Sequence, residues 1–135
     1  MNDSLSILII DDDEDDREWL SQAILETGPE FRISDVPSAK DGLALLKQVD
    51  GELPDMIFLD MNMPLMNGLQ CLEEIRKENR LQNIPVVVYT TSPMFTGIDK
   101  IKKFEPVLFL TKPSRFNEIV DAVHDLFTQY FESQH

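Results

Sequence analysis

Five short apolar runs recur along the chain at regular intervals, and this pattern restricts the fold more than any other feature. The runs are residues 4–10, 31–36, 55–60, 85–90 and 106–111. All but the second are nearly continuous in apolar residues, which is typical of strands that are covered on both faces. The pattern therefore predicts a central sheet of five strands that is mostly parallel.

Segments with helical spacing separate the five runs. We expect the first helix to stop at Gly28-Pro29, where a glycine precedes a residue that cannot continue a helix. Ser38 and Ser114 are suited to cap the second and the last helices, and the third helix is expected to end near Asn79. Each apolar run is thus followed by a helical segment.

The segment 92–104 is the least distinct of these, because Pro93 and Gly97 weaken its helical pattern. We expect a short or distorted fourth helix there. Strand and helix then alternate five times, and parallel strands require right-handed crossovers. The prediction is an α/β fold, a three-layer doubly wound (βα)5 sandwich with one five-stranded parallel sheet.

Composition excludes several classes of partner. The 135 residues include 12 basic and 25 acidic ones, for a net charge of −13, which repels nucleic acids and anionic membranes. No segment approaches the ~18 apolar residues of a membrane span, and the N-terminus lacks a signal-peptide pattern. The single cysteine, Cys71, agrees with a reducing compartment and is expected to be buried in a helix. We expect one soluble cytoplasmic domain over residues 1–135 that binds neither nucleic acid nor membrane.

Polar residues follow four of the predicted strands, at the edge where ligands bind in open parallel sheets. They are Asp11-Asp12, Asp60, Thr90-Thr91 and Lys112. Two or three carboxylates at such an edge suit a hard divalent cation such as Mg²⁺. A lysine and a hydroxyl suit phosphoryl oxygens, which leaves one carboxylate as a nucleophile. The pattern therefore indicates an aspartyl phosphate.

Four segments carry a resemblance to a known family. "ILIIDD", "IFLDMNMPLMNG", "VVVYTT" and "FLTKP" resemble, in order and spacing, the signature segments of two-component response-regulator receiver domains. The resemblance covers nearly the whole chain and is to the stand-alone, chemotaxis-response-regulator-like kind. It implies a flavodoxin-like fold with strand order 2-1-3-4-5 and no output domain.

The resemblance also implies a role for each residue of the predicted site. It makes Asp60 the phosphoacceptor, Thr90 the hydroxyl that turns toward the phosphoryl group, Lys112 the ion-pair partner and Phe109 a rotating switch aromatic. Mg²⁺ or Mn²⁺ would be held by Asp11, Asp12, Asp60 and the backbone carbonyl of Asn62, and the Lys112-Pro113 bond would be cis.

By the same resemblance, the phosphoryl donor is a histidine kinase or a histidine phosphotransfer protein. The downstream protein partner is unknown, the chain is a monomer or a weak homodimer, and it turns over no metabolite. The segment "KKFEPVLFL" departs from the family pattern, so the partner cannot be copied from a relative. Lys100, Lys102 and Lys103 are either a site for an acidic partner or a solvated helix face.

Several residues keep two interpretations at this stage. Trp19 and Pro113 are candidates for partner docking, and Trp19 is alternatively a peripheral core contact. Phe109 is alternatively a core aromatic. Thr91 and Ser92 compete with Thr90 for the site hydroxyl. Thr91 is bulkier than the alanine common at its position in relatives, and Ser92 and Asn62 are neutral polar groups beside the path of a hydrolytic water. We therefore expect a moderately long-lived phosphoryl group.

Three other classes of protein share parts of this sequence pattern. A haloacid-dehalogenase-like phosphatase would use Asp11 and Asp13 and would be phosphorylated at Asp11. A calcium-binding loop fails, because Asp16 and Gln22 stand where a glycine and a glutamate are required. An interaction module without phosphorylation is disfavoured, because the whole set of five site residues is present.

Overall fold

Strand and helix alternate along the chain, as the spacing of the apolar runs predicts. The computed structural model describes all residues except 1–4, 29, 49–50, 92–97 and 133–135. The strands are Ser6–Ile10 (β1), Arg32–Val36 (β2), Met56–Leu59 (β3), Val86–Thr90 (β4) and Val107–Thr111 (β5). The helices are Glu14–Thr27 (α1), Ala39–Leu46 (α2), Gly68–Lys77 (α3), Ile98–Lys102 (α4) and Phe116–Glu132 (α5), with a 3₁₀ turn at Asn79–Leu81 (η1).

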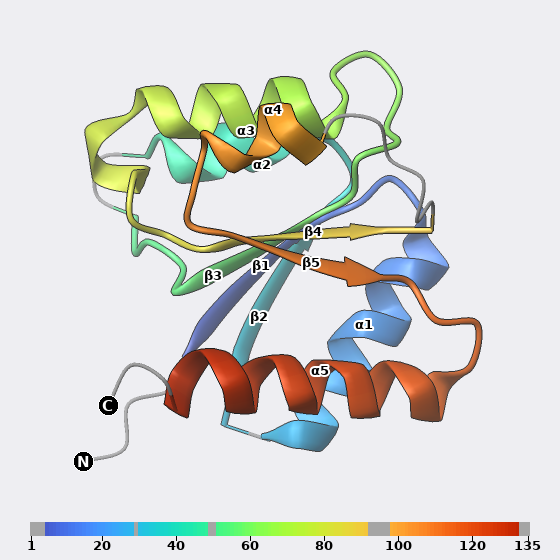
Figure 1. Cartoon of the computed structure of the whole chain (residues 1–135). Helices are drawn as coiled ribbons and strands as arrows, with labels where there is room; N and C mark the ends of the chain where they lie inside the picture. Colours follow the sequence, from blue (N-terminus) through green and yellow to red (C-terminus); the bar gives the residue numbers. More distant parts are fainter. Residues whose placement is uncertain (1–4, 29, 49–50, 92–97, 133–135) are drawn as a thin grey trace.

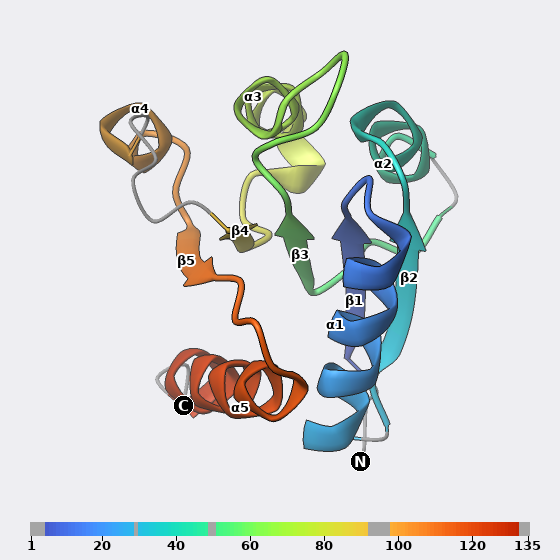
Figure 2. The same cartoon turned by 90° about the vertical axis from the view of Figure 1, so that its right-hand side faces the viewer.

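The five strands form one parallel sheet in the order β2-β1-β3-β4-β5. Helices α1 and α5 cover one face, and α2, α3 and α4 lie on the other (Figures 1 and 2). Each face has its own hydrophobic cluster of buried side chains. The predicted three-layer fold and its strand order are therefore confirmed.

Burial of the strands follows their place in the sheet. β3 and β4 are buried along their whole length, and β1 is buried from Ile7 onward, because these strands have a neighbour on each side. β5 was predicted to be covered as well, which is wrong: it is the edge strand, and Phe109 on it is 45% exposed. The apolar composition of a run therefore does not tell an edge strand from a central one.

Side-chain caps set the helix starts. Asp13 caps α1 by accepting a hydrogen bond from the Asp16 amide at 3.0 Å, and acidic residues fill the first turn, where the helix dipole favours negative charge. Ser38 caps α2 in the same way. The last helix begins at Phe116 rather than at Ser114. Within the described part of the chain, no helix is long and apolar enough to cross a membrane.

The fourth helix is short within the described residues, as predicted. It spans Ile98–Lys102, and the remainder of the indistinct segment, residues 92–97, lies outside the described residues. Cys71 is fully buried in α3, and burial raises the pKa of its thiol to about 12. The prediction that Cys71 is buried in a helix is confirmed.

Candidate functional site

The backbone of the site is held by the parallel sheet. The amide of Asp60 donates to the carbonyl of Ile10 at 3.0 Å, and the amide of Lys112 donates to the carbonyl of Thr90 at 2.8 Å. The sheet pattern thus continues one residue beyond β3 and β5. Since all strands run the same way, the residues after them meet at one edge, where the sequence predicted the site.

Three carboxylates meet at this edge. Asp11 and Asp60 are buried, Asp12 is exposed, and one oxygen of each lies within 4.8 Å of the others. Asp60 is only 6% exposed, and this burial raises its pKa to about 6, with Lys112 opposing the shift and Asp11 adding to it. Like charges this close repel unless a cation neutralises them, so the arrangement suits a divalent metal.

The Lys112 side chain lies among the carboxylates and is 8% exposed. Its Nζ is 2.7 Å from an Asp11 oxygen, 2.9 Å from an Asp16 oxygen and 3.8 Å from an Asp60 oxygen. Burial alone would lower the pKa of this ammonium, but its hydrogen bonds to Asp11 and Asp16 and the nearby negative charges raise that pKa above its ordinary value. Lys112 is therefore charged, and it neutralises only part of the cluster.

Asn62 links Asp60 to Thr90. The Asn62 amide donates to a carboxylate oxygen of Asp60 at 3.2 Å, and its side-chain nitrogen donates to the Thr90 hydroxyl at 3.3 Å. Thr90 is buried beside the cluster, whereas Thr91 is exposed. This geometry favours Thr90 as the site hydroxyl; Ser92 lies outside the described residues.

The segment after Asp60 is shaped by the start of α3. Asn67 and Gln70 form a reciprocal capping box at the helix N-terminus. Gly68, directly after Asn67, packs against the backbone of Asp60 and Met61. An added Cβ would lie 2.6 Å from the carbonyl oxygen of Asp60 and 2.6 Å from the Cα of Met61. The sequence "NG", which indicates a turn in isolation, here starts a helix that packs against the backbone of Asp60 and Met61.

Two residues of α1 belong to the site although no motif indicated them. Asp16 pairs with Lys112, as described above, and Arg17 donates to the Asp11 carbonyl at 2.8 Å and to Asp35 at 2.9 Å. The signal that could have found them is their position, because the first turn of a helix that follows β1 starts at the same edge of the sheet.

The other predicted residues surround the site without joining the carboxylate cluster. Trp19 on α1 is half-exposed and makes an edge-on contact with Phe116 of α5, with ring centroids 6.5 Å apart. It is therefore both a peripheral core contact and partly accessible. Phe109 lies on the face of β5 that carries Val107, toward α4, and its exposure excludes the core interpretation.

The predicted cis bond before Pro113 is wrong. Among the described residues the cis X-Pro bond is Glu105-Pro106, at the opposite end of β5. Trans and cis forms of an X-Pro bond differ by only about 0.5–1 kcal/mol, so the surrounding structure decides the isomer and a sequence pattern cannot.

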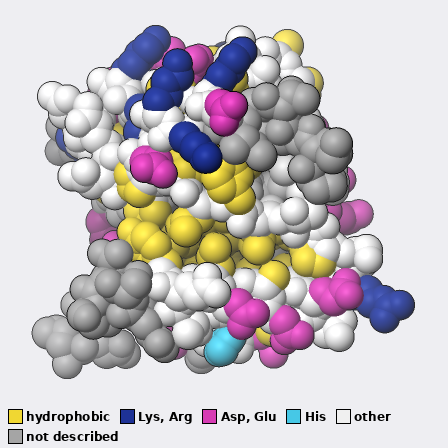
Figure 3. Space-filling view, in the orientation of Figure 1, with side chains coloured by type: hydrophobic (Ala, Val, Ile, Leu, Met, Phe, Trp, Pro, Cys, Tyr) yellow, Lys and Arg dark blue, Asp and Glu magenta, His cyan; other side chains and the backbone are white. Residues whose placement is uncertain are grey.

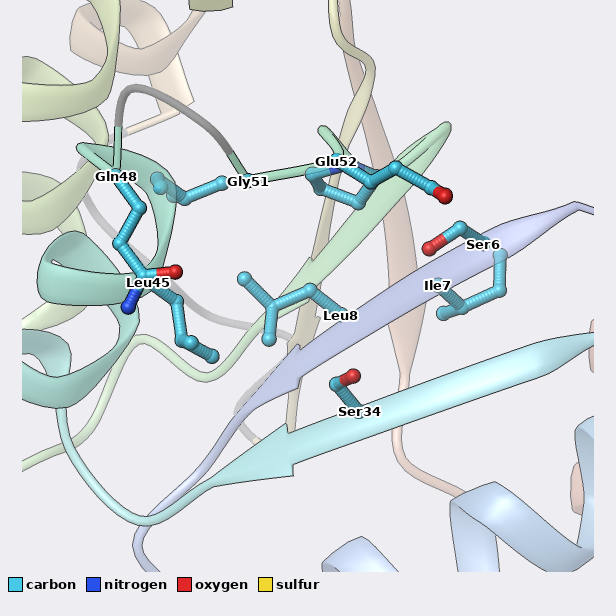
Figure 4. A pocket seen from close by; sticks show the side chains of 10 residues that line it. Ser6, Ile7, Leu8, Ser34, Leu45, Gln48, Gly51 and Glu52 are labelled. Atoms are coloured by element: carbon cyan, nitrogen blue, oxygen red, sulfur yellow. The ribbon is translucent and has the colours of Figure 1, made fainter.

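A cavity of about 120 Å³ lies far from this chemistry. It is at the amino ends of β1 and β2, beneath α2 (Figure 4), and its lining includes Ser6, Leu8, Ser34, Leu45 and Pro54. Open parallel sheets bind ligands at the other end of their strands. The carboxyl edge, not this cavity, is the candidate site.

Comparisons with known proteins agree with the geometry. The family model of the response regulator receiver domain matches residues 7–124. Response regulator Rre1 from Synechocystis sp. is 31% identical over 131 residues, which are 96% of this chain and 54% of Rre1. The phosphorylated cyanobacterial phytochrome response regulator RcpA superposes with a TM-score of 0.86 at 23% identity, covering 97% of this chain and 96% of RcpA. The Mn²⁺-bound form of response regulator Rcp1 superposes with a TM-score of 0.80 at 23% identity, covering 93% of this chain and 94% of Rcp1.

The matches favour a receiver domain over a haloacid-dehalogenase-like phosphatase. The chain spans about half the length of Rre1, and it also matches short parts of histidine kinases. The haloacid-dehalogenase-like alternative is not supported by these matches, and its second aspartate, Asp13, is an exposed helix cap. Receiver domains are signalling domains that accept a phosphoryl group. The chain belongs to the response regulator receiver domain family.

Proposed function

We propose that Asp60 takes the phosphoryl group in this receiver domain, from a phosphohistidine of a histidine kinase or a histidine phosphotransfer protein. One observation carries the proposal: Asp60 is a buried carboxylate beside Asp11, Asp12 and Lys112, and unlike Asp11 it is not hydrogen-bonded to the Lys112 ammonium. A carboxylate oxygen of Asp60 would attack phosphorus, the phosphorus–nitrogen bond would break, and the imidazole would leave with that electron pair and take up a proton. An acyl phosphate forms on Asp60.

A divalent cation, Mg²⁺ or Mn²⁺, is proposed at the same edge, held by Asp11, Asp12, Asp60 and the carbonyl of Asn62. The donor set fits, because oxygens bound to one such ion at about 2.1 Å lie at most about 4.2 Å apart. The three carboxylates need only a small contraction from their spacing of up to 4.8 Å. A bound cation would neutralise charge on the carboxylates and on the incoming phosphoryl oxygens. The Mn²⁺-bound structure of Rcp1 supports this proposal by analogy.

The protein's own residues would read the modified state. A phosphoryl group adds negative charge and acceptor oxygens beside Lys112 and the Thr90 hydroxyl. Thr90 would exchange its bond with Asn62 for one with the phosphoryl group, and the exposed ring of Phe109 on the neighbouring strand would move with it. Thr90 is the last residue of β4, and Lys112 directly follows β5. The rearrangement would therefore be transmitted along the side of the sheet that β4 and β5 form.

The lifetime of the phosphoryl group is proposed to depend on Thr91. This side chain is exposed next to Thr90, where a hydrolytic water would approach. Thr91→Ala should hydrolyse faster than wild type, measured as loss of the phosphorylated mass after the donor is removed. No faster decay would contradict the proposal.

The surface beside β5 is proposed as the output face. Figure 3 shows a band of hydrophobic side chains. Lys and Arg side chains with some Asp and Glu side chains among them lie on one side of the band, and mainly Asp and Glu side chains lie on the other. The band lies at the level of β5, between α4 and α5, and the exposed Phe109 is on that strand. A downstream protein would bind there, with the exposed Lys100, Lys102 and Lys103 attracting acidic groups of the partner.

Contact with the phosphodonor is proposed on a different surface, around the half-exposed Trp19 and Pro113 at the edge of the site. We propose that the chain acts in the cytoplasm as a monomer or a weak homodimer and turns over no metabolite. In that case it catalyses only its own phosphorylation and dephosphorylation.

Incubation with acetyl phosphate and Mg²⁺, followed by intact mass measurement, tests the central proposal. Wild type should gain the mass of one phosphoryl group, and Asp60→Asn should not. Asp55→Asn, at the other end of the same strand, is the matched control and should be labelled like wild type. Equal labelling of wild type and Asp60→Asn would show that Asp60 is not the acceptor.

A further inference from the structure

Asp16 makes a contact that the proposed phosphoryl chemistry does not explain. It is the third residue of α1, and its carboxylate lies 2.9 Å from the Lys112 Nζ. The distance from the same Nζ to Asp60 is 3.8 Å, beyond hydrogen-bonding range. In the unphosphorylated chain, the ammonium is therefore bonded to Asp11 and Asp16 rather than to the phosphoacceptor.

We infer that Asp16 is a positioning residue that holds Lys112 in the resting state and competes with phosphorylated Asp60 for its ammonium. The inference rests on the proposed function of Asp60 and adds a regulatory residue to it. Asp16 would lower the affinity of the site for a phosphoryl group and hold the resting state until one arrives.

The competition follows from the charges around one ammonium. A phosphoryl group carries about −1.5 to −2 charge and three strong acceptor oxygens, so it is a stronger partner for Lys112 than a single carboxylate. To reach it, Lys112 must weaken one of its two present hydrogen bonds.

Exposure decides which bond is released. Asp11 is buried, and a carboxylate that loses its partner in a buried place is strongly destabilised. The Asp16 side chain is 39% exposed, so water can replace the ammonium there at little cost. Lys112 therefore moves away from Asp16 and keeps its contact with Asp11.

A purely structural role at the start of α1 predicts a different result. Acidic residues in the first turn stabilise a helix through its dipole, and Asp15 does this as well as Asp16. Asp15 is exposed, and substitution to Asn removes the same charge from the same helical turn. Comparing Asp16→Asn with Asp15→Asn thus separates the contact with Lys112 from the general effect of charge.

The test measures binding of beryllofluoride, a stable mimic of the phosphoryl group, in the presence of Mg²⁺. Titrations followed by backbone amide NMR should show that Asp16→Asn binds it about threefold to tenfold more tightly than wild type. Asp15→Asn should stay within about twofold of wild type, because it leaves Lys112 untouched. Asp16→Glu, which restores a carboxylate, should return the affinity toward the wild-type value.

A second measurement reports on the ammonium itself. In the unliganded protein, the ¹⁵Nζ signal of Lys112 should shift in Asp16→Asn and stay in place in Asp15→Asn. Urea unfolding of each variant establishes that it is folded. If Asp16→Asn does not fold, Asp16→Ser serves as the uncharged variant in its place.

The outcomes separate this inference from the proposed function. Wild type that binds no beryllofluoride would overturn both. Wild type that binds it, together with Asp16→Asn that binds no more tightly than Asp15→Asn, would overturn the role of Asp16 alone. Weaker binding by Asp16→Asn would also overturn it, because Asp16 would then assist the phosphorylated state.

Discussion

Strand β3 has an aspartate at each end, and the two carboxylates are in opposite situations. Asp55, just before the strand, is exposed and accepts a hydrogen bond from the Ser6 amide at 2.8 Å. Asp60, just after it, is buried among other carboxylates, and its pKa is raised to about 6. The same residue type is thus exposed and hydrogen-bonded at the amino end of the strand, and buried among like charges at its carboxyl end.

The difference extends to the two edges of the sheet. The amino edge has a small cavity lined largely by serine, leucine and proline (Figure 4), whereas the carboxyl edge has crowded carboxylates and one ammonium. Each edge also has a glycine and an exposed leucine. Equivalent substitutions at the two edges should therefore have different effects on the free energy of unfolding.

The largest effect is expected from Gly68→Ala. Its Cβ would lie 2.5 Å from the Met61 sulfur and 2.6 Å from the Asp60 carbonyl oxygen, so the backbone of the site must shift. We expect a loss of about 2–3 kcal/mol in the free energy of unfolding, measured with urea, and reduced phosphorylation by acetyl phosphate.

The matched control is Gly51→Ala at the amino edge. There the nearest atoms are the Cβ and Oε1 of Gln48, both at 3.3 Å, so shifts of a few tenths of an ångström are enough to make room. We expect a change within about 0.5 kcal/mol. Losses of equal size for the two variants would show that α3 is not held against the Asp60 segment by close packing.

The second effect is that Asp60→Asn stabilises the folded chain in the absence of metal, by an amount that depends on pH. The pKa of Asp60 is about 6 in the folded chain and 3.8 in the unfolded one, so the folded state binds this proton more tightly. Wild-type stability should therefore fall as pH rises from about 4 to about 7, by roughly 2–3 kcal/mol from this group. Asn stays neutral and escapes this loss.

Urea unfolding of wild type and Asp60→Asn at pH 4 and pH 8 measures this difference in stability. Asp60→Asn should exceed wild type by about 2 kcal/mol at pH 8 and by little at pH 4. Asp55→Asn should differ from wild type by less than about 0.5 kcal/mol at both pH values, because its carboxylate is exposed. A stability gain that is the same at both pH values would contradict the buried-charge explanation.

The third effect is stabilisation by Mg²⁺. A ligand at ten times its dissociation constant raises the free energy of unfolding by about 1.4 kcal/mol. The gain should be lost in Asp12→Asn, whose exposed side chain contributes one of the proposed ligands, and kept in Asp15→Asn. It should also shrink at pH 5, where Asp60 is largely protonated. Equal gains in both variants would exclude this metal site.

Much of this arrangement was predictable from sequence. The apolar runs predicted the strands, and the residues after them predicted the cluster, because parallel strands bring Asp11, Asp60 and Lys112 to one edge whatever the details of packing. Within β4, sequence favoured Thr90 but left Thr91 open. Burial beside Asn62 favours Thr90.

The remainder depends on geometry that no local pattern encodes. Asp16 was not predicted as a site residue, because its contact with Lys112 requires α1 and the end of β5 to be placed side by side. The exposure of Phe109 follows from β5 being the edge strand. The isomer of each X-Pro bond is decided by small energies of the surrounding chain.

The smallest effect concerns the exposed leucine at each edge. Leu65, in the loop between β3 and α3, is fully exposed at a φ of 69°, a region where leucine is strained and asparagine is favoured. Leu65→Asn should stabilise the chain by about 0.5–1 kcal/mol. Leu45→Asn, in helix α2 beside the cavity, should destabilise it by a similar amount, because asparagine forms helices less well than leucine. Urea unfolding measures both changes in the free energy of unfolding. If the two changes have the same sign, backbone strain at Leu65 is not what distinguishes the two leucines.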